Sequence, residues 1–220
     1  MAPMIKICGI TSAEAADAAA RAGADFAGLV FHPKSPRHLM ADAARALAQR
    51  LLGRVRLVAL MADPRDEDVL HVVNNTVPDF LQLHGSESPA RVGELREKFG
   101  LPIIKALPIA DASDLAALPA YEEAADMLLF DAKAPADAER GGGHGVAFDW
   151  QLLRSRTISR PWFLAGGLSA ENVARAVAAS SAPGVDVSSG VETSPGVKSA
   201  EMIQAFVAAA RNAHFAGAAA

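Results

Sequence analysis

The chain has 220 residues, of which 51% are hydrophobic, and 25 acidic against 21 basic residues give a formal net charge of −4. Apolar residues are thus plentiful enough for a packed core, while no Lys/Arg run marks a nucleic-acid surface and no apolar stretch reaches the ~18 residues of a membrane span. An anionic ligand would have to be held by local donors rather than by a basic surface.

Cys8 is the only cysteine, which excludes an internal disulfide. The first residues, MAPMIKICGI, contain no basic segment followed by an apolar signal region. We therefore expect a cytoplasmic protein that partners neither nucleic acid nor membrane. The alanine-rich end of the chain is expected to be a short tail.

Eight short apolar or β-branched runs follow one another along the chain, and each is a candidate strand. They are MIKIC from Met4, FAGLVF from Phe26, VRLVALM from Val55, FLQLH from Phe80, PIIKAL from Pro102, MLLFDA from Met127, WFLAGG from Trp162 and GVDVSSG from Gly184.

Segments with helical spacing lie between these runs. Examples are Ala44, Leu47, Ala48 and Leu51 in one segment, and Ile203, Phe206, Val207 and Ala210 in the last. Thr11, with Glu14 three residues later, and Ser169 are expected to begin helices.

This regular alternation predicts parallel strands joined by helical crossovers, in either an open doubly wound sheet or a closed barrel. Eight units favour the barrel, and 220 residues lie near the low end of the ~200 to 400 residues typical of it. We predict an α/β fold, a (β/α)8 TIM barrel that forms a single domain over residues 1–220. Chemistry in this fold lies at the carboxyl ends of the strands.

Glycine-rich loops, AGGLSAEN and DVSSGVET, follow the last two predicted strands. Glycines let backbone N–H groups approach a ligand closely, and barrels of this kind commonly hold phosphate after strands seven and eight. An alternative is that the glycines only cap turns. We expect a small phosphorylated metabolite to bind there, through Gly166, Gly167, Ser188, Ser189, Gly190 and Val191.

Cys8 ends the first predicted strand and Asp131 ends the sixth, so both are expected at the mouth of the barrel. A thiol and a carboxyl group suit general acid/base catalysis without a metal. The thiolate is a competent base only if positive charge or a helix dipole lowers its pKa, and Lys6 and the following helix start are candidates for this. Packing for Cys8 and loop ordering for Asp131 are the structural alternatives.

Six segments together resemble the phosphoribosylanthranilate isomerases of tryptophan biosynthesis, from Lys6 to about Lys198. They are KICGIT, GADFAGLVFHPKSPRHL, LQLHG, LLFDA, AGGLSAENV and GVDVSSGVETSPGVK. The resemblance implies a cofactor-free Amadori rearrangement of N-(5-phosphoribosyl)anthranilate to 1-(2-carboxyphenylamino)-1-deoxyribulose 5-phosphate. It implies that Asp131 is the acid that protonates the ribose ring oxygen and that Cys8 is the base that removes the proton from C2.

The resemblance also suggests residues that bind the substrate. Arg37 matches an arginine that faces the anthranilate part, where a guanidinium fork suits a carboxylate. His84 matches a residue to which we assign pocket shaping, and Asp186 one that orders the floor of the site. We include Lys6 as a source of positive charge.

A long loop, residues 133–150, follows the sixth predicted strand and contains the run GGGHG. We expect Gly141, Gly142, Gly143 and Gly145 to form a mobile lid that excludes water. His144 stands where the family usually carries Thr or Asn, and we assign it no part in the chemistry.

Two other functions remain open at this point. A sugar-phosphate epimerase on the same barrel would hold a divalent metal with His32, His84 and Asp131. A phosphosugar-binding module would need none of the catalytic residues. We expect no metal, no cofactor, and a monomer or homodimer.

Overall fold

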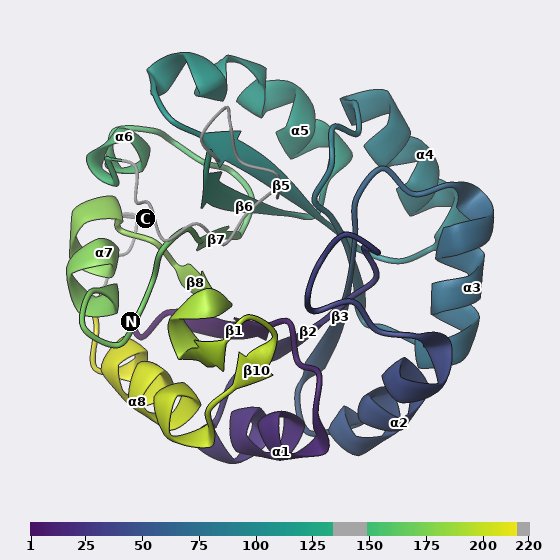
Figure 1. Cartoon of the computed structure of the whole chain (residues 1–220). Helices are drawn as coiled ribbons and strands as arrows, with labels where there is room; N and C mark the ends of the chain where they lie inside the picture. Colours follow the sequence, from purple (N-terminus) through teal and green to yellow (C-terminus); the bar gives the residue numbers. More distant parts are fainter. Residues whose placement is uncertain (134–148, 215–220) are drawn as a thin grey trace.

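The computed structural model of the chain describes residues 1–133 and 149–214. Eight parallel strands close into a barrel in chain order (Figure 1). They are β1 (Met4–Cys8), β2 (Phe26–Val30), β3 (Arg56–Met61), β4 (Phe80–Leu83), β5 (Ile103–Ile109), β6 (Met127–Ala132), β7 (Trp162–Leu164) and β8 (Gly184–Val187). Each predicted run overlaps one of these strands, and the predicted (β/α)8 barrel is confirmed.

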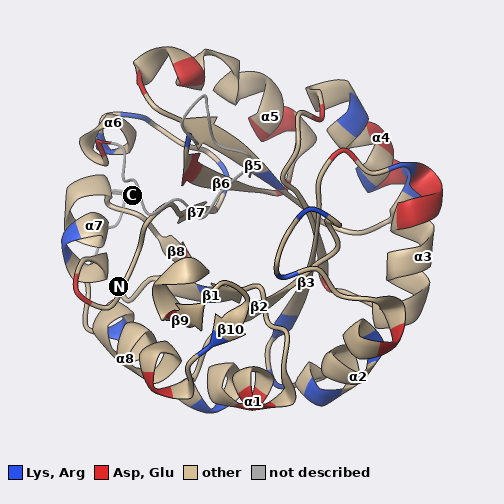
Figure 2. Cartoon of the chain, in the orientation of Figure 1, with Lys and Arg blue, Asp and Glu red and all other residues tan. Residues whose placement is uncertain are grey.

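Helices surround the barrel (Figure 1). In the described ranges they are α1 (Ala13–Ala22), α2 (Ala41–Leu51), α3 (Asp66–Thr76), α4 (Pro89–Phe99), α5 (Leu118–Ala124), α6 (Gln151–Arg154), α7 (Val173–Ser180) and α8 (Ala200–Arg211), with two 3-10 helices, η1 (Ala112–Ala117) and η2 (Ser189–Val191). The predicted apolar faces of α2 and α8 are buried. Basic and acidic positions are interspersed around this ring (Figure 2). Within the described part of the chain, no helix has both the length and the apolarity to cross a membrane.

The amino end of the barrel is filled by aromatic side chains. Phe26 makes edge-to-face contacts with Phe80 and Phe163, with ring centroids 5.6 and 5.2 Å apart. These rings pack with the inward side chains of Val58 and Ile104, because alternate residues of a strand point to the same side. These packed side chains close the amino end of the barrel, so a ligand enters at the carboxyl ends of the strands.

Two helices begin later than the sequence predicts. Thr11 does not cap α1, because its hydroxyl donates to the carbonyl oxygen of Gly196 at 2.7 Å. Ser12 caps the helix instead and accepts from the backbone N–H of Ala15. Similarly, α7 begins after Asn172 rather than after Ser169.

A short antiparallel hairpin, β9 (Glu192–Ser194) and β10 (Val197–Lys198), follows η2 and was not predicted. Glu192 and Lys198 are cross-strand partners in it. The hairpin turns at Gly196, whose φ is +83°, and a Cβ there would lie 2.7 Å from the carbonyl oxygen of Pro36. The hairpin therefore packs closely against the loop between β2 and α2.

Candidate active site

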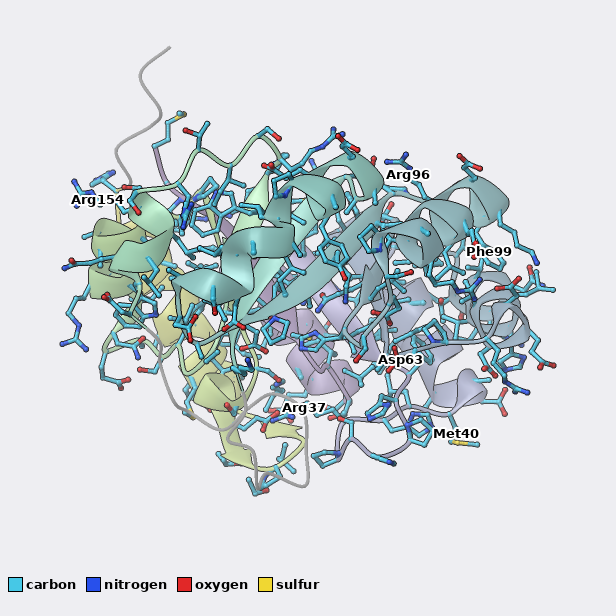
Figure 3. The ribbon with its side chains drawn as sticks, turned by 90° about the horizontal axis from the view of Figure 1, so that it is seen from above. Arg37, Met40, Asp63, Arg96, Phe99 and Arg154 are labelled. Carbon is cyan, nitrogen blue, oxygen red and sulfur yellow. The ribbon has the colours of Figure 1, made fainter. Side chains whose placement is uncertain are left out.

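A cavity of about 140 Å³ opens at the carboxyl end of the barrel and brings both predicted catalytic residues and four of the predicted binding residues together. It is lined by Cys8, Val30, His32, Ser35, Arg37, Leu60, Ala62, His84, Asp131, Asp186 and Ser188. Figure 3 shows Arg37 and Asp63, from the loops after β2 and β3, on one side of the molecule. Arg96 of α4 and Arg154 of α6 lie on the other side.

Cys8 is the last residue of β1 and is only 5% exposed. Its strand partner on β2 is Gly28, and a Cβ added to Gly28 would lie 3.0 Å from the Cys8 sulfur. A larger residue at position 28 would therefore press on the thiol. The absence of a side chain here leaves room for the sulfur beside the cavity.

Burial raises the pKa of the Cys8 thiol, and the nearby Lys6 ammonium lowers it by less. The expectation that a helix start holds this pKa down is wrong. The N–H groups of Gly9 and Ile10 donate to the carbonyl oxygen of Gly28 at 2.9 and 3.0 Å, and α1 begins only at Ala13.

Lys6 lies one layer deeper in the barrel, fully buried, with its Nζ 2.8 Å from a carboxylate oxygen of Asp186. Burial lowers the pKa of Lys6, but its interactions with the Asp186 carboxylate, and with the Cys8 thiolate when that forms, raise it above its ordinary value. Lys6 thus stays protonated. It does not line the cavity as a substrate-binding residue would, so its charge acts on the site through Cys8.

Asp131 is the second-last residue of β6, and His84 directly follows β4. His84 Nε2 lies 3.3 Å from Asp131 Oδ2, and His84 Nδ1 lies 2.9 Å from the amide nitrogen of Gln82. His84 therefore lies between the Gln82 amide and the Asp131 carboxyl group, with one ring nitrogen near each. His84 therefore does more than shape the pocket, since it contacts the carboxyl group directly.

Arg37 reaches the cavity from the loop between β2 and α2. Its Nε and Nη2 donate to the two carboxylate oxygens of Glu192, at 2.7 and 2.8 Å. Its Cδ passes over Gly9, where φ is +78° and a Cβ would lie only 2.4 Å away. Sequence reasoning missed Glu192, since a short polar hairpin has no apolar period.

The two glycine loops after β7 and β8 lie against each other. A Cβ on Gly190 would come within 1.9 Å of the carbonyl oxygen of Leu168, so only glycine fits. Gly166 and Gly167 have φ of +87° and +64°. The side chain of Asn172 donates to the carbonyl oxygen of Gly167 at 2.8 Å and steadies this loop.

The predicted phosphate ligands after β8 are only partly free for a ligand. Ser188 accepts from the Lys198 ammonium through both its carbonyl oxygen and its hydroxyl, at 2.9 and 3.2 Å. Val191 donates its N–H to the Ser188 carbonyl oxygen at 3.3 Å. Ser189 and Gly190 begin and continue the short helix η2.

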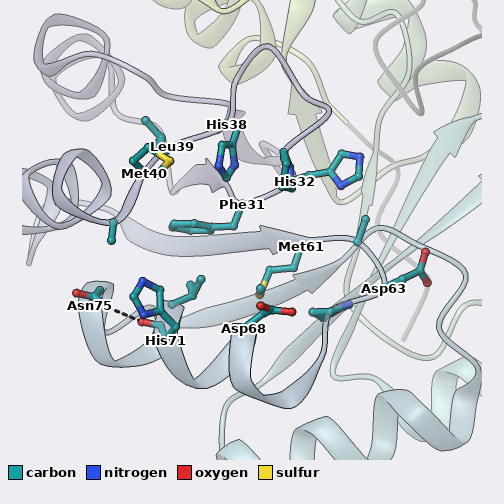
Figure 4. Close-up of a pocket in the computed structure, with 15 residues that line it drawn as sticks. Phe31, His32, His38, Leu39, Met40, Met61, Asp63, Asp68, His71 and Asn75 are labelled. Atoms are coloured by element: carbon teal, nitrogen blue, oxygen red, sulfur yellow. Dashed lines mark hydrogen bonds between the residues drawn. The ribbon is translucent and has the colours of Figure 1, made fainter.

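A larger cavity of about 360 Å³ lies beside the first, between the segment after β2 and helix α3 (Figure 4). Phe31 and His38 face it from one side, and His71 and Asn75 of α3 from the other. It shares His32 and Ala62 with the smaller cavity but contains neither the thiol nor Asp131. Size therefore does not decide the active site, whereas the chemistry of the lining does.

Two expectations concern other parts of the chain. The predicted lid glycines, Gly141, Gly142, Gly143 and Gly145, together with His144 and the terminal residues 215–220, lie outside the described residues. Among the residues that are described, no group of three or more His, Cys, Asp or Glu side chains is placed to hold a metal ion.

Comparison with known proteins identifies close similarities. The family model of N-(5'-phosphoribosyl)anthranilate (PRA) isomerase matches residues 5–209. An N-(5'-phosphoribosyl)anthranilate isomerase of Rhodopseudomonas palustris (strain BisA53) is 53% identical over 207 residues, which cover 94% of this chain and 95% of that relative.

Solved structures of proteins with the same name are also similar to this chain. Phosphoribosyl anthranilate isomerase from Thermotoga maritima superposes with a TM-score of 0.85 at 35% identity, over 94% of this chain and 98% of that one. Two others have TM-scores of 0.81 at 33% identity, with the same coverage. One is such an isomerase in complex with reduced 1-(o-carboxyphenylamino)-1-deoxyribulose 5-phosphate. The other describes monomers generated from the dimeric T. maritima isomerase.

Proposed function

The chain belongs to the N-(5'-phosphoribosyl)anthranilate isomerase family, which acts in tryptophan biosynthesis, and we propose that Cys8 and Asp131 divide the family's reaction between them. The single observation that carries this division is that a thiol and a carboxyl group, from opposite parts of the sequence, line one small cavity. The reaction is an Amadori rearrangement of N-(5-phosphoribosyl)anthranilate to 1-(2-carboxyphenylamino)-1-deoxyribulose 5-phosphate.

The proton transfers follow from the two groups. Asp131 gives its proton to the ribose ring oxygen, and the C1–O bond breaks to leave a Schiff base. The Cys8 thiolate then removes the proton from C2, and the electron pair moves into the enolamine. Tautomerisation of the enolamine gives the ketone, so no electrons are exchanged with a cofactor.

Neighbouring residues support each step. When Asp131 has lost its proton, the polar ring of His84, with Nε2 3.3 Å from Oδ2, lies beside the resulting carboxylate. The Lys6 ammonium lies near the thiol and stabilises the thiolate, while Asp186 holds Lys6 in place. A high thiol pKa makes the thiolate scarce at neutral pH but a stronger base once it forms.

Binding would divide between the two ends of the substrate. Arg37 would face the anthranilate carboxylate, and the glycine loops after β7 and β8 would hold the phosphate. The related complex supports this, because its ligand carries both a carboxyphenyl group and a 5-phosphate. We extend the proposal to a single-domain, cytoplasmic protein that is a monomer or a homodimer. A dimeric relative supports the second assembly.

The purified protein is expected to convert N-(5-phosphoribosyl)anthranilate, measured as loss of substrate fluorescence, at the same rate with and without EDTA. The reason is that both proposed steps are proton transfers by side chains. Activity that EDTA abolishes and a divalent cation restores would instead support the metal-dependent epimerase. Tight ligand binding with no turnover would support the binding module.

Alkylation of the ligand-free protein by iodoacetamide is expected to speed up with pH and to reach half its maximal rate above the ordinary thiol pKa of about 8.5. The direction follows because burial favours the neutral thiol, so the reactive thiolate forms only at higher pH. Cys8 is the only cysteine, so the rate reports one site. Glutathione titrated in parallel is the control, and a midpoint below that of glutathione would show that Lys6 outweighs burial.

A further inference from the structure

The hairpin after β8 places three charged side chains together at the rim of the cavity. Arg37 comes from the loop after β2, Glu192 from β9 and Lys198 from β10. The Glu192 side chain is 4% exposed and that of Lys198 is fully buried. Ionic groups buried to this degree are costly unless they are paired, so the arrangement must be specific.

Glu192 is the centre of the cluster. One of its oxygens accepts from both Arg37 Nε and Lys198 Nζ, each at 2.7 Å, and the other accepts from Arg37 Nη2 at 2.8 Å. A bidentate contact of this kind fixes the plane of the guanidinium as well as its position. Glu192 accepts from two of the five guanidinium N–H groups of Arg37, along one edge. The other three N–H groups do not donate to Glu192.

Charge balance explains why a second cation is present. An arginine paired with one carboxylate is nearly neutral as a unit and attracts an anion weakly. Lys198 adds a second positive charge, so the three groups together carry a net charge of about +1 at the side of the cavity. Burial lowers the pKa of Lys198 and the Glu192 carboxylate opposes this shift.

Packing holds the hairpin and the arginine loop together. Thr11 donates to the carbonyl oxygen of Gly196 in the hairpin, and Gly196 lies directly against Pro36, the residue before Arg37. Lys198 also donates to Ser188 after β8. The cluster is therefore anchored to the ends of both β1 and β8.

We propose that Glu192 and Lys198 are positioning residues for the substrate carboxylate: Glu192 fixes the guanidinium of Arg37, and Lys198 offsets the charge of Glu192. Arg37 then presents a fixed, positively charged edge to the cavity. This inference rests on the proposed function, in which Arg37 faces the anthranilate carboxylate.

Two stable ligands test it by calorimetry: reduced 1-(2-carboxyphenylamino)-1-deoxyribulose 5-phosphate and its phenylamino counterpart, which lacks only the carboxylate. The ratio of their Kd values measures the preference for the carboxylate. Glu192→Gln and Lys198→Met should each reduce this ratio by roughly tenfold, the scale of one lost hydrogen bond to a charged group. Lys198→Arg keeps the positive charge and should restore most of the preference.

The Glu192→Gln variant separates positioning from simple charge. Removing the negative charge alone would strengthen carboxylate binding, whereas loss of positioning weakens it. A preference that is unchanged or increased in Glu192→Gln would overturn the inference. If thermal unfolding shows that Glu192→Gln does not fold, Glu192→Asp takes its place. Glu192→Asp should show a smaller loss of the carboxylate preference.

Two further variants identify which idea fails. Arg37→Met should abolish the preference for the carboxylate; if it does not, the proposed role of Arg37 is wrong and the inference falls with it. If Arg37→Met abolishes the preference while Glu192→Gln and Lys198→Met keep it, only the inference fails. Glu94→Gln, which removes an exposed carboxylate on α4, is the matched control and should leave both Kd values unchanged.

Discussion

Cys8→Ala is expected to lower kcat by roughly 100-fold or more, with only a modest change in KM. The variant removes the proposed base but leaves Arg37 and the glycine loops, which bind the two ends of the substrate. The loss should therefore appear in the chemical step. The measurement is steady-state turnover of N-(5-phosphoribosyl)anthranilate, followed by fluorescence.

Cys8→Ser is the companion variant, because the hydroxyl nearly preserves the size of the thiol but ionises far less readily. It should be about as inactive as Cys8→Ala. Thermal unfolding should show both variants folded, since Cys8 is a small side chain whose apolar cluster has only two other members, Val30 and Leu60, so few packing contacts are lost. Turnover of Cys8→Ala at the parent rate would remove the thiol from the mechanism.

Asp131→Asn is expected to cost a similar factor, roughly 100-fold or more in kcat. The amide has nearly the same shape as the carboxyl group and still fits beside the His84 ring, so the geometry of the site is kept. What it lacks is a proton acidic enough to give to the ribose ring oxygen. The same turnover assay measures the effect.

The matched control for Asp131 is Asp42→Asn, which removes an exposed carboxylate in the first turn of α2. It should turn over substrate at the parent rate. Parent activity in Asp131→Asn would require another acid. Loss of substrate affinity without loss of kcat would make Asp131 a binding residue.

The strands and helices could be predicted because their side chains repeat along the chain. β1 occupies the predicted run from Met4 to Cys8, and the buried face of α8 consists of the four residues that helical spacing identifies. Counting eight units then favoured closure. Closure in turn placed the ends of β1 and β6 at one rim, so the residue pattern alone was enough to pair Cys8 with Asp131.

Capping and ionisation were harder to predict. Thr11 has the right residue type for a helix cap, but its hydroxyl is taken by Gly196, a residue 185 positions away. The thiol of Cys8 has a lysine two residues back, yet burial outweighs it and raises the pKa. In both cases a local pattern was overruled by a contact or an environment that the fold creates.

By itself the sequence determined the barrel and the family, and it singled out the two residues to which we assign the proposed chemistry. Tertiary structure alone decided how the charges pair: Lys6 with Asp186, 180 residues away, and Arg37 with Glu192, 155 residues away. The physical reason is that periodicity reports which side chains are buried by neighbours along the chain, whereas these ion pairs exist only after the barrel has closed and the hairpin has folded over its rim.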